Sequence, residues 1–223
     1  MAHQVEYPGR LIAIEGSRGK DTAAAAAAAI KALGDAGVES AISRFDASGL
    51  FGELAAAARG DRQISIRTLS LVYAADLAFR LRWEIRPVLE AGGVVIAAPY
   101  VETAVGFGVS CGLSEEWIRE LLRFAPKPDL GARAQERKLD RGWKPRLDRG
   151  YAEYCAAMLQ GSASKVASKS ARRDAMALLD RPRGRKVYRL AEEEGVKDLV
   201  KGVTGSRQGA QRPSASKPRS ARK

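Results

Sequence analysis

The chain has 223 residues, 45% of them hydrophobic, and a formal net charge of +12. This length allows one domain with a full hydrophobic core. No apolar run approaches the roughly 20 residues of a membrane-spanning helix, and the first residues lack the pattern of a signal peptide. Cys111 and Cys155 lie far apart and the one histidine is His3, so we expect reduced thiols, no metal site and a cytoplasmic location.

The first quarter of the chain predicts two strands and two helices. Residues 10–15 form a short apolar run that ends at Gly16. Residues 22–33 include seven consecutive alanines, the residue with the highest helix propensity. Residues 38–45 are predicted to form the second strand, and residues 52–59 a short Ala-rich helix.

The middle of the chain predicts further helices and a buried strand. Residues 65–91 have apolar side chains along one helical face, and Pro87 is expected to kink this helix or to start a new turn. Residues 94–98 are wholly apolar, as is typical of a central parallel strand. Residues 114–124 predict a helix with Ser114 as its N-cap. Alternating strands and helices indicate an α/β fold with a mainly parallel sheet, whose central strands are the first and third.

The last third of the chain is less regular. Residues 186–190 predict a strand and residues 196–203 a last helix. The final twenty residues hold six Lys or Arg and no acid among Ser, Ala, Pro and Gly. Such a segment cannot bury enough apolar surface to fold. We therefore expect one domain over residues 8–203 and a disordered basic tail over residues 204–223.

The stretch LIAIEGSRGKDT has the order of a phosphate-binding loop but not its spacing. In the motif G-x-x-x-x-G-K-[ST], backbone N–H groups surround a phosphate, while the lysine and the hydroxyl serve phosphate and Mg²⁺. Counted back from Lys20, the first glycine should fall at Ile14, so Gly16 is two residues too close. Two interpretations stay open: a tight turn before a helix that Asp21 or Thr22 caps, or a shortened anion site at the helix N-terminus.

From residue 9 to residue 130, the chain resembles the thymidylate kinase family of P-loop nucleoside monophosphate kinases. The family's strand, Glu-Gly and Gly-Lys-[ST]-Thr are matched by LIAIEGSRGKDT. Its LLF-A-A-D-R helix, I-R-P-x-L turn and Asp-Arg-Tyr strand are matched by RTLSLVYAADLAFRLRWEIRPVLEAGGVVIAAPY. Its Lys-Pro-Asp-Leu and its closing strand and helix are matched by LRFAPKPDL and KVYRLAEEEGVKDLVKGV. The resemblance implies a three-layer P-loop NTPase-like fold and, in an active protein, phosphate transfer from ATP to dTMP with Mg²⁺.

The resemblance also implies which residues form the site. The cofactor-binding residues are then Gly16, Gly19, Lys20, Asp21 and Thr22. The candidate catalytic cations are Lys20, Arg18 and Arg137. The substrate-binding residues are Arg44, Tyr73, Asp76 and Tyr100. Arg44 matches an arginine that holds the acceptor phosphate, and Tyr73 matches an aromatic residue that stacks on thymine.

Several family positions hold other residues. Leu77 stands where an arginine reads a thymine carbonyl, and Ala98 and Pro99 replace the Asp-Arg of Asp-Arg-Tyr. In the family, that Asp helps to organise Mg²⁺ and the acceptor, and that Arg binds the acceptor phosphate. The family's next strand and the segment before its lid are expected to be absent after Leu130. Lid arginines are then expected at Arg133, Arg137 and Arg141.

Three hypotheses follow, of which we favour the first. The chain is a thymidylate-kinase-like nucleotide-binding protein with weak or no activity. In the second hypothesis it is a working nucleoside monophosphate kinase, in which Asp76 or Asp21 serves the metal and Arg18 and Lys20 the phosphates. In the third it is a scaffold that contacts a polyanion through its tail, although the tail has no aromatic residue for base stacking. The expected partner is ATP, dTMP or another nucleoside monophosphate. No membrane contact is expected, and a homodimer is allowed.

Overall fold

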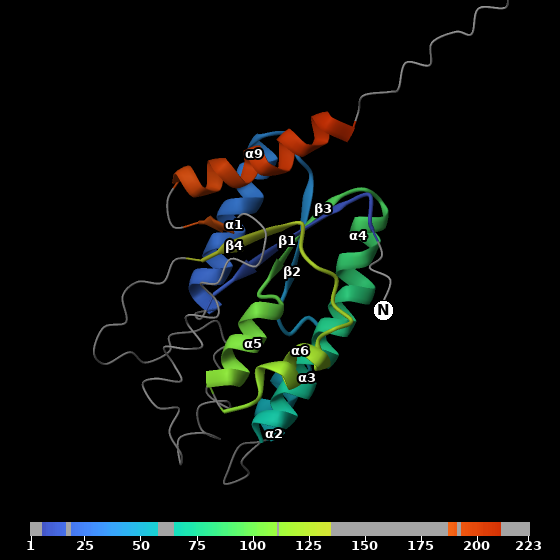
Figure 1. The fold of residues 1–223 in the computed structure, drawn as a ribbon, viewed down its shortest axis with the longest axis vertical. Helices are drawn as coiled ribbons and strands as arrows, with labels where there is room; N and C mark the ends of the chain where they lie inside the picture. Colours follow the sequence, from blue (N-terminus) through green and yellow to red (C-terminus); the bar gives the residue numbers. More distant parts are fainter. Residues whose placement is uncertain are drawn as a thin grey trace, which may run out of the picture.

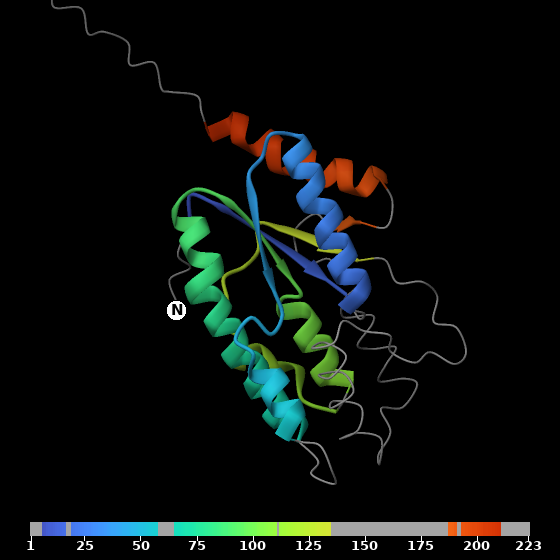
Figure 2. The ribbon, with the colours of Figure 1, turned by 180° about the vertical axis from the view of Figure 1, so that it is seen from behind.

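The computed structural model describes residues 6–16, 19–57, 65–110, 112–134, 187–190 and 193–210. A five-stranded sheet in the order β2-β3-β1-β4-β5 lies between two layers of helices (Figures 1 and 2). Its strands are β1 (Arg10–Glu15), β2 (Ser40–Arg44), β3 (Val94–Ala98), β4 (Leu130–Arg133) and β5 (Val187–Arg189). Every pair of neighbouring strands is parallel, so the predicted α/β fold is confirmed.

β1 and β3, the strands predicted to be central, lie in the interior of the sheet. All five residues of β3 are buried, as are the four inner residues of β1. In the register, Ile12 lies opposite Ile96 of β3 and Leu130 of β4. Strands that are apolar on both faces need helices on both sides of the sheet.

One face of the sheet is covered by α1 (Gly19–Asp35) and α9 (Glu193–Ala210) (Figure 2). The alanines of α1 form a helix as predicted, and Ala25, Ala26 and Ala29 pack in the core on this face. The last helix was predicted to end at residue 203, which is wrong, because α9 continues to Ala210. The first part of the predicted tail is therefore helical, and residues 211–223 lie outside the described residues.

The other face is covered by α2 (Leu50–Ala57), α3 (Ile66–Arg80), η1 (Leu81–Ile85), α4 (Arg86–Glu90), α5 (Val101–Ser110) and α6 (Glu115–Leu121). The predicted long helix is present as α3, η1 and α4, and its middle part is a π-helix. Pro87 lies in the first turn of α4, where its missing N–H is best tolerated. Ser114 caps α6 as predicted, because its side chain accepts a hydrogen bond from the Trp117 N–H.

Two elements, α5 and β4, were missing from the sequence prediction. α5 was not predicted, since its two glycines and its valines have low helix propensity. β4 was expected to be absent, but the residues directly after Asp129 form it. The Leu11 N–H donates to Asp129 Oδ2 at 2.8 Å, and the Asp129 N–H donates to the Leu11 carbonyl oxygen. Asp129 thus sets the start of β4 beside β1, and Arg133 ends this strand instead of lying in a lid.

None of the helices in the described part of the chain combines the length and apolar character that a membrane span requires.

Gly195 tests the packing of α9 on β5. A Cβ atom at Gly195 would overlap the backbone carbonyl oxygen of Arg189, which cannot rotate away as a side chain could. We expect Gly195→Ala to lower the free energy of unfolding by about 1–3 kcal/mol, as overpacking does. The melting temperature, followed by circular dichroism, measures this change.

Gly205 on the same helix is the matched control, because a Cβ atom there meets nothing within 4 Å. Gly205→Ala should stabilise the protein by up to about 1 kcal/mol, since alanine favours a helix more than glycine does. Equal effects of the two substitutions would contradict the contact between α9 and β5. A loss of stability in Gly205→Ala would contradict the continuation of α9 beyond Val203.

Candidate active site

The carboxyl ends of β1, β2 and β3 meet at one edge of the sheet, where open α/β sheets bind ligands. α1 begins close to β1 and α5 close to β3 (Figure 1). Of the predicted phosphate loop, Gly16 and the helix from Gly19 onward are described, whereas Arg18 lies outside the described residues. The side chain of Lys20 is also outside them, as is Arg137.

Gly16 packs closely against the first turn of α1. A Cβ atom at this position would lie 2.7 Å from Thr22 Oγ1, so only glycine fits without a shift. Thr22 is buried, and the Gly16 N–H donates to Thr103 Oγ1 at 3.1 Å. α1 begins at Gly19, so Asp21 and Thr22 lie within its first turn and are not its N-cap. An acid in this position interacts favourably with the helix dipole.

Glu15, the last residue of β1, binds the start of α5. Its Oε2 atom accepts hydrogen bonds from the Tyr100 N–H at 3.1 Å, the Thr103 N–H at 2.9 Å and Thr103 Oγ1 at 2.5 Å. Its Oε1 atom accepts one from the Glu102 N–H at 3.1 Å. Burial raises the pKa of Glu15 above its ordinary value, although the hydrogen bonds from Thr103 act in the opposite direction. This carboxylate therefore caps α5 from another strand.

Asp76 binds the segment between β2 and α2. It is fully buried and accepts hydrogen bonds from the Asp46 N–H at 3.2 Å, the Ser48 N–H at 3.0 Å and Ser48 Oγ at 2.8 Å. Asp46 has a positive φ of 58°, and its own carboxylate accepts hydrogen bonds from the Phe51 and Gly52 N–H groups at the start of α2. Two carboxylates in succession thus hold this segment in place.

Arg80 connects the ends of β2 and β3, and the sequence analysis missed it. Its Nε donates to Ser43 Oγ at 2.9 Å, and its Nη2 donates to the carbonyl oxygens of Ser43 and Pro99 at 3.0 and 2.9 Å. Ser43 Oγ in turn donates to Glu84 Oε2 at 2.6 Å. The side chain is fully buried, and its Nη1 has no hydrogen-bond partner in the described part of the chain. A signal was present, because Arg80 follows Leu77 by three residues on the apolar face of the helix.

The structure brings Tyr73 and Tyr100, two of the predicted substrate-binding residues, together in the core. The Tyr73 hydroxyl donates to the Tyr100 carbonyl oxygen at 2.7 Å, and the Tyr100 hydroxyl donates to the carbonyl oxygen of Pro126 at 2.8 Å. Each side chain is 1% exposed, and burial raises the pKa of both phenols. Arg44, by contrast, is exposed at the end of β2. Contact of these residues with an acceptor nucleotide stays a prediction.

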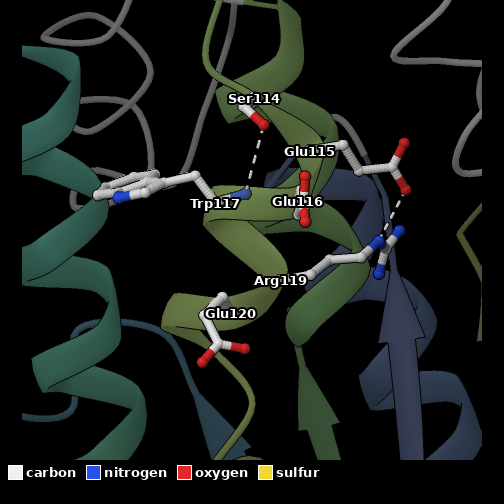
Figure 3. A pocket seen from close by; sticks show the side chains of 6 residues that line it. All are labelled: Ser114, Glu115, Glu116, Trp117, Arg119 and Glu120. Carbon is white, nitrogen blue, oxygen red and sulfur yellow. Dashed lines mark hydrogen bonds and ion pairs between the residues drawn. The ribbon is translucent and has the colours of Figure 1, made fainter.

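A hollow on α6 is lined by Ser114, Glu115, Glu116, Trp117, Arg119 and Glu120 (Figure 3). Arg119 is paired with Glu115 at 2.7 Å and makes two hydrogen bonds of 2.9 Å to Glu102 at the start of α5. The three glutamates that line this hollow, together with Glu102, outnumber the paired arginine and repel a phosphate. The strand ends are therefore the better candidate for a nucleotide site.

Comparison with known proteins matches part of the chain. No family model matches it. A "Probable thymidylate kinase" of Pyrococcus abyssi is 40% identical over 68 residues, which are 30% of this chain and 33% of that protein. Proteins of the same name from Thermococcus kodakarensis and Pyrobaculum aerophilum are 41% identical over 68 residues and 33% identical over 61. These matches cover 30% and 27% of this chain, and 33% and 32% of the two relatives. The chain thus spans about a third of the length of the curated relatives it matches.

Because its pKa is raised, Glu15 makes the free energy of unfolding fall as the pH rises. Because the pKa of Glu15 in the folded protein is raised above 4.5, the folded state keeps this proton to a higher pH than the unfolded chain does. The contribution of Glu15 to stability is therefore fully present below pH 4.5 and is lost as the pH rises through the raised pKa.

We expect Glu15→Gln to remove this pH-dependent component. The melting temperature of the unmodified protein, relative to that of the variant, should fall as the pH rises above 4.5. Melting curves in a series of buffers measure this difference, and Glu120→Gln at an exposed position of α6 is the matched control. A difference between Glu15→Gln and the unmodified protein that stays constant with pH would contradict the raised pKa.

Proposed function

We propose that this chain, which is related to the thymidylate kinases, binds a nucleotide at the carboxyl ends of β1, β2 and β3 and transfers phosphate weakly or not at all. The family reaction is transfer from ATP to dTMP. The relatives support a nucleotide-kinase-like function in general, and the further steps rest on the geometry of the strand ends. A cytoplasmic location remains our prediction.

One observation carries the proposal: carboxylates at the strand ends are engaged by the protein itself. Glu15 accepts four hydrogen bonds from the start of α5, and Asp76 accepts three from the segment after β2. Asp46 caps α2, and Glu102 is paired with Arg119. A Mg²⁺ site needs oxygen ligands that are free to turn toward the metal, and these carboxylates are held in place by the structural hydrogen bonds that they accept.

The end of β3 supports the same conclusion. Ala98 and Pro99 occupy the positions at which the family resemblance expects an aspartate and an arginine, and both are buried. Phosphoryl transfer depends on positioning and on electrostatic stabilisation of the transferred group. If each missing interaction costs about 2–4 kcal/mol, as single catalytic hydrogen bonds do, their combined loss lowers the rate by several powers of ten.

The start of α1 is compatible with a bound ATP. α1 is 17 residues long and begins at Gly19, four positions after the end of β1, and the N-terminus of a long helix favours a phosphate. Lys20 in its first turn adds a positive charge. We therefore assign the phosphates of a bound nucleotide to Gly16, Gly19, Lys20 and Thr22. When bound, Mg²⁺ would supply charge neutralisation between these phosphates.

The alternative, a working kinase with rearranged groups, depends on the metal ligand. Asp76 is unsuited to that role because it is fully buried and holds the segment after β2. Asp21, in the first turn of α1, is then the candidate that remains in this alternative. Polyanion contact was predicted through residues 204–223, of which residues 204–210 belong to α9 and residues 211–223 lie outside the described residues.

We expect dTMP phosphorylation with ATP and Mg²⁺ to be at or near background. The double substitution Ala98→Asp with Pro99→Arg should raise the rate only slightly, because the phosphate loop remains short. A coupled assay for ADP measures turnover, and circular dichroism checks that the variant is folded. Turnover by the unmodified protein at roughly 1 s⁻¹ or more, which is ordinary for a kinase, would support the rearranged active site instead.

Lys20→Ala tests the nucleotide site independently of catalysis. We expect it to abolish ATP binding measured by isothermal titration, because it removes the lysine ammonium group that is predicted to pair with the phosphates. Lys31→Ala is the matched control, since Lys31 lies on the same helix, is exposed and pairs with Asp35. Unchanged ATP affinity in Lys20→Ala would show that the loop does not bind phosphate.

A further inference from the structure

The ring of Tyr73 is covered by another ring of the same chain. The ring centroids of Phe45 and Tyr73 are 5.6 Å apart, and the ring planes differ by 18°, which is a stacked arrangement. Phe45 also contacts Phe51 at 4.5 Å between centroids. Tyr73 is 1% exposed, so the protein surrounds the rest of its ring. A flat ligand could stack on Tyr73 only where Phe45 now lies.

The position of Phe45 is fixed by the segment that follows it. Asp76 accepts three hydrogen bonds from Asp46 and Ser48, directly after Phe45. Asp46 caps α2, which buries Phe51 beneath Phe45. The contact between the rings is therefore supported from both sides and does not depend on a freely rotating side chain.

Phe45 also lies where a ligand would arrive. It directly follows β2 at the edge formed by the carboxyl ends of the strands, and it is only partly buried. Arg44, the residue before it, is exposed. At this edge a guanidinium group is therefore accessible to a phosphate, while the aromatic surface beside it is already occupied.

We propose that Phe45 fills the slot for the acceptor base, so that this half of the site takes a phosphate monoester without stacking on a nucleobase. This inference rests on the proposed nucleotide-binding function and names the class of acceptor: a small phosphate ester held by its phosphate. Removal of the Phe45 ring exposes one face of Tyr73, and a pyrimidine base can then stack on it.

The experiment measures the affinities of dTMP and of 2-deoxyribose 5-phosphate by isothermal titration. The two ligands share the sugar and the phosphate and differ in the base. The unmodified protein should bind them with similar affinity. Phe45→Ala should bind dTMP about tenfold more tightly, as expected for one base stacked on an aromatic ring, with unchanged affinity for 2-deoxyribose 5-phosphate.

Two further variants make the result decisive. Phe79→Ala removes an exposed phenylalanine from the helix that carries Tyr73 and should leave both affinities unchanged. Phe45→Leu keeps much of the apolar volume but has no ring, so it should shift dTMP binding in the same direction by a smaller factor. Melting curves identify folded variants, and Phe45→Leu decides the result if Phe45→Ala does not fold.

The inference is overturned if the unmodified protein prefers dTMP about tenfold over the sugar phosphate and loses this preference in Phe45→Ala, because Phe45 would then contact the base. It is also overturned if folded Phe45→Ala binds neither ligand. Titration of ATP in the same series tests nucleotide binding separately from the role of Phe45. Binding of ATP by the unmodified protein leaves the proposed function in place, whereas failure to bind ATP removes that function as well.

Discussion

Glu15 joins the end of β1 to the start of α5, and the arrangement of the strand ends depends on this contact. Four donors from Tyr100, Glu102 and Thr103 converge on one carboxylate. Buried N–H groups at a helix start are costly when they lack a partner, so α5 can begin here only because Glu15 receives them. The hydroxyl of Thr103, which donates to Glu15, also accepts a hydrogen bond from the Gly16 N–H. Gly16, the first residue of the predicted phosphate loop, therefore contacts α5 as well as α1.

Arg80 joins the ends of β2 and β3 in the way that Glu15 joins β1 to α5. The guanidinium group of Arg80 binds the carbonyl oxygens of Ser43, near the end of β2, and of Pro99, directly after β3. No ion pair of Arg80 is found in the described part of the chain. Glu84 is connected to it only through the hydroxyl of Ser43. A buried charge without a direct partner is costly, and a network that meets most of its hydrogen bonds reduces that cost. Removing Ser43 or Glu84 therefore affects Arg80 and the positions of both strand ends.

Much of the fold could be predicted because its signals are local. The apolar runs of β1 and β3, the alanines of α1 and the cap at Ser114 are each readable within a few residues. α5 could not be predicted in this way, because its cap is a glutamate 88 positions before Thr103 in the sequence. β4 is short, with a glycine and an arginine among its four residues, and it depends on Asp129 beside Leu11. Helical spacing correctly placed Tyr73 and Leu77 on one face. It could not show that Phe45 covers Tyr73, since that contact depends on a segment held by Asp76.

The carboxyl end of β1 therefore differs from those of β2 and β3 in the groups that are available to a ligand. Near β1, the N-terminus of a long helix favours a phosphate, and Gly16 allows the chain to pack closely against Thr22 in this helix. Near β2 and β3, Tyr73, Asp76, Tyr100 and Arg80 bind one another or the backbone in the core. Phosphate transfer requires donor and acceptor to be held in line at the same time, which is why we propose weak transfer or none where the slot for the acceptor base is filled. Binding near β1 needs none of those side chains. Under the proposed function, the chain therefore binds a nucleotide by its phosphates near β1, while Tyr73 and Tyr100 near β3 belong to the core.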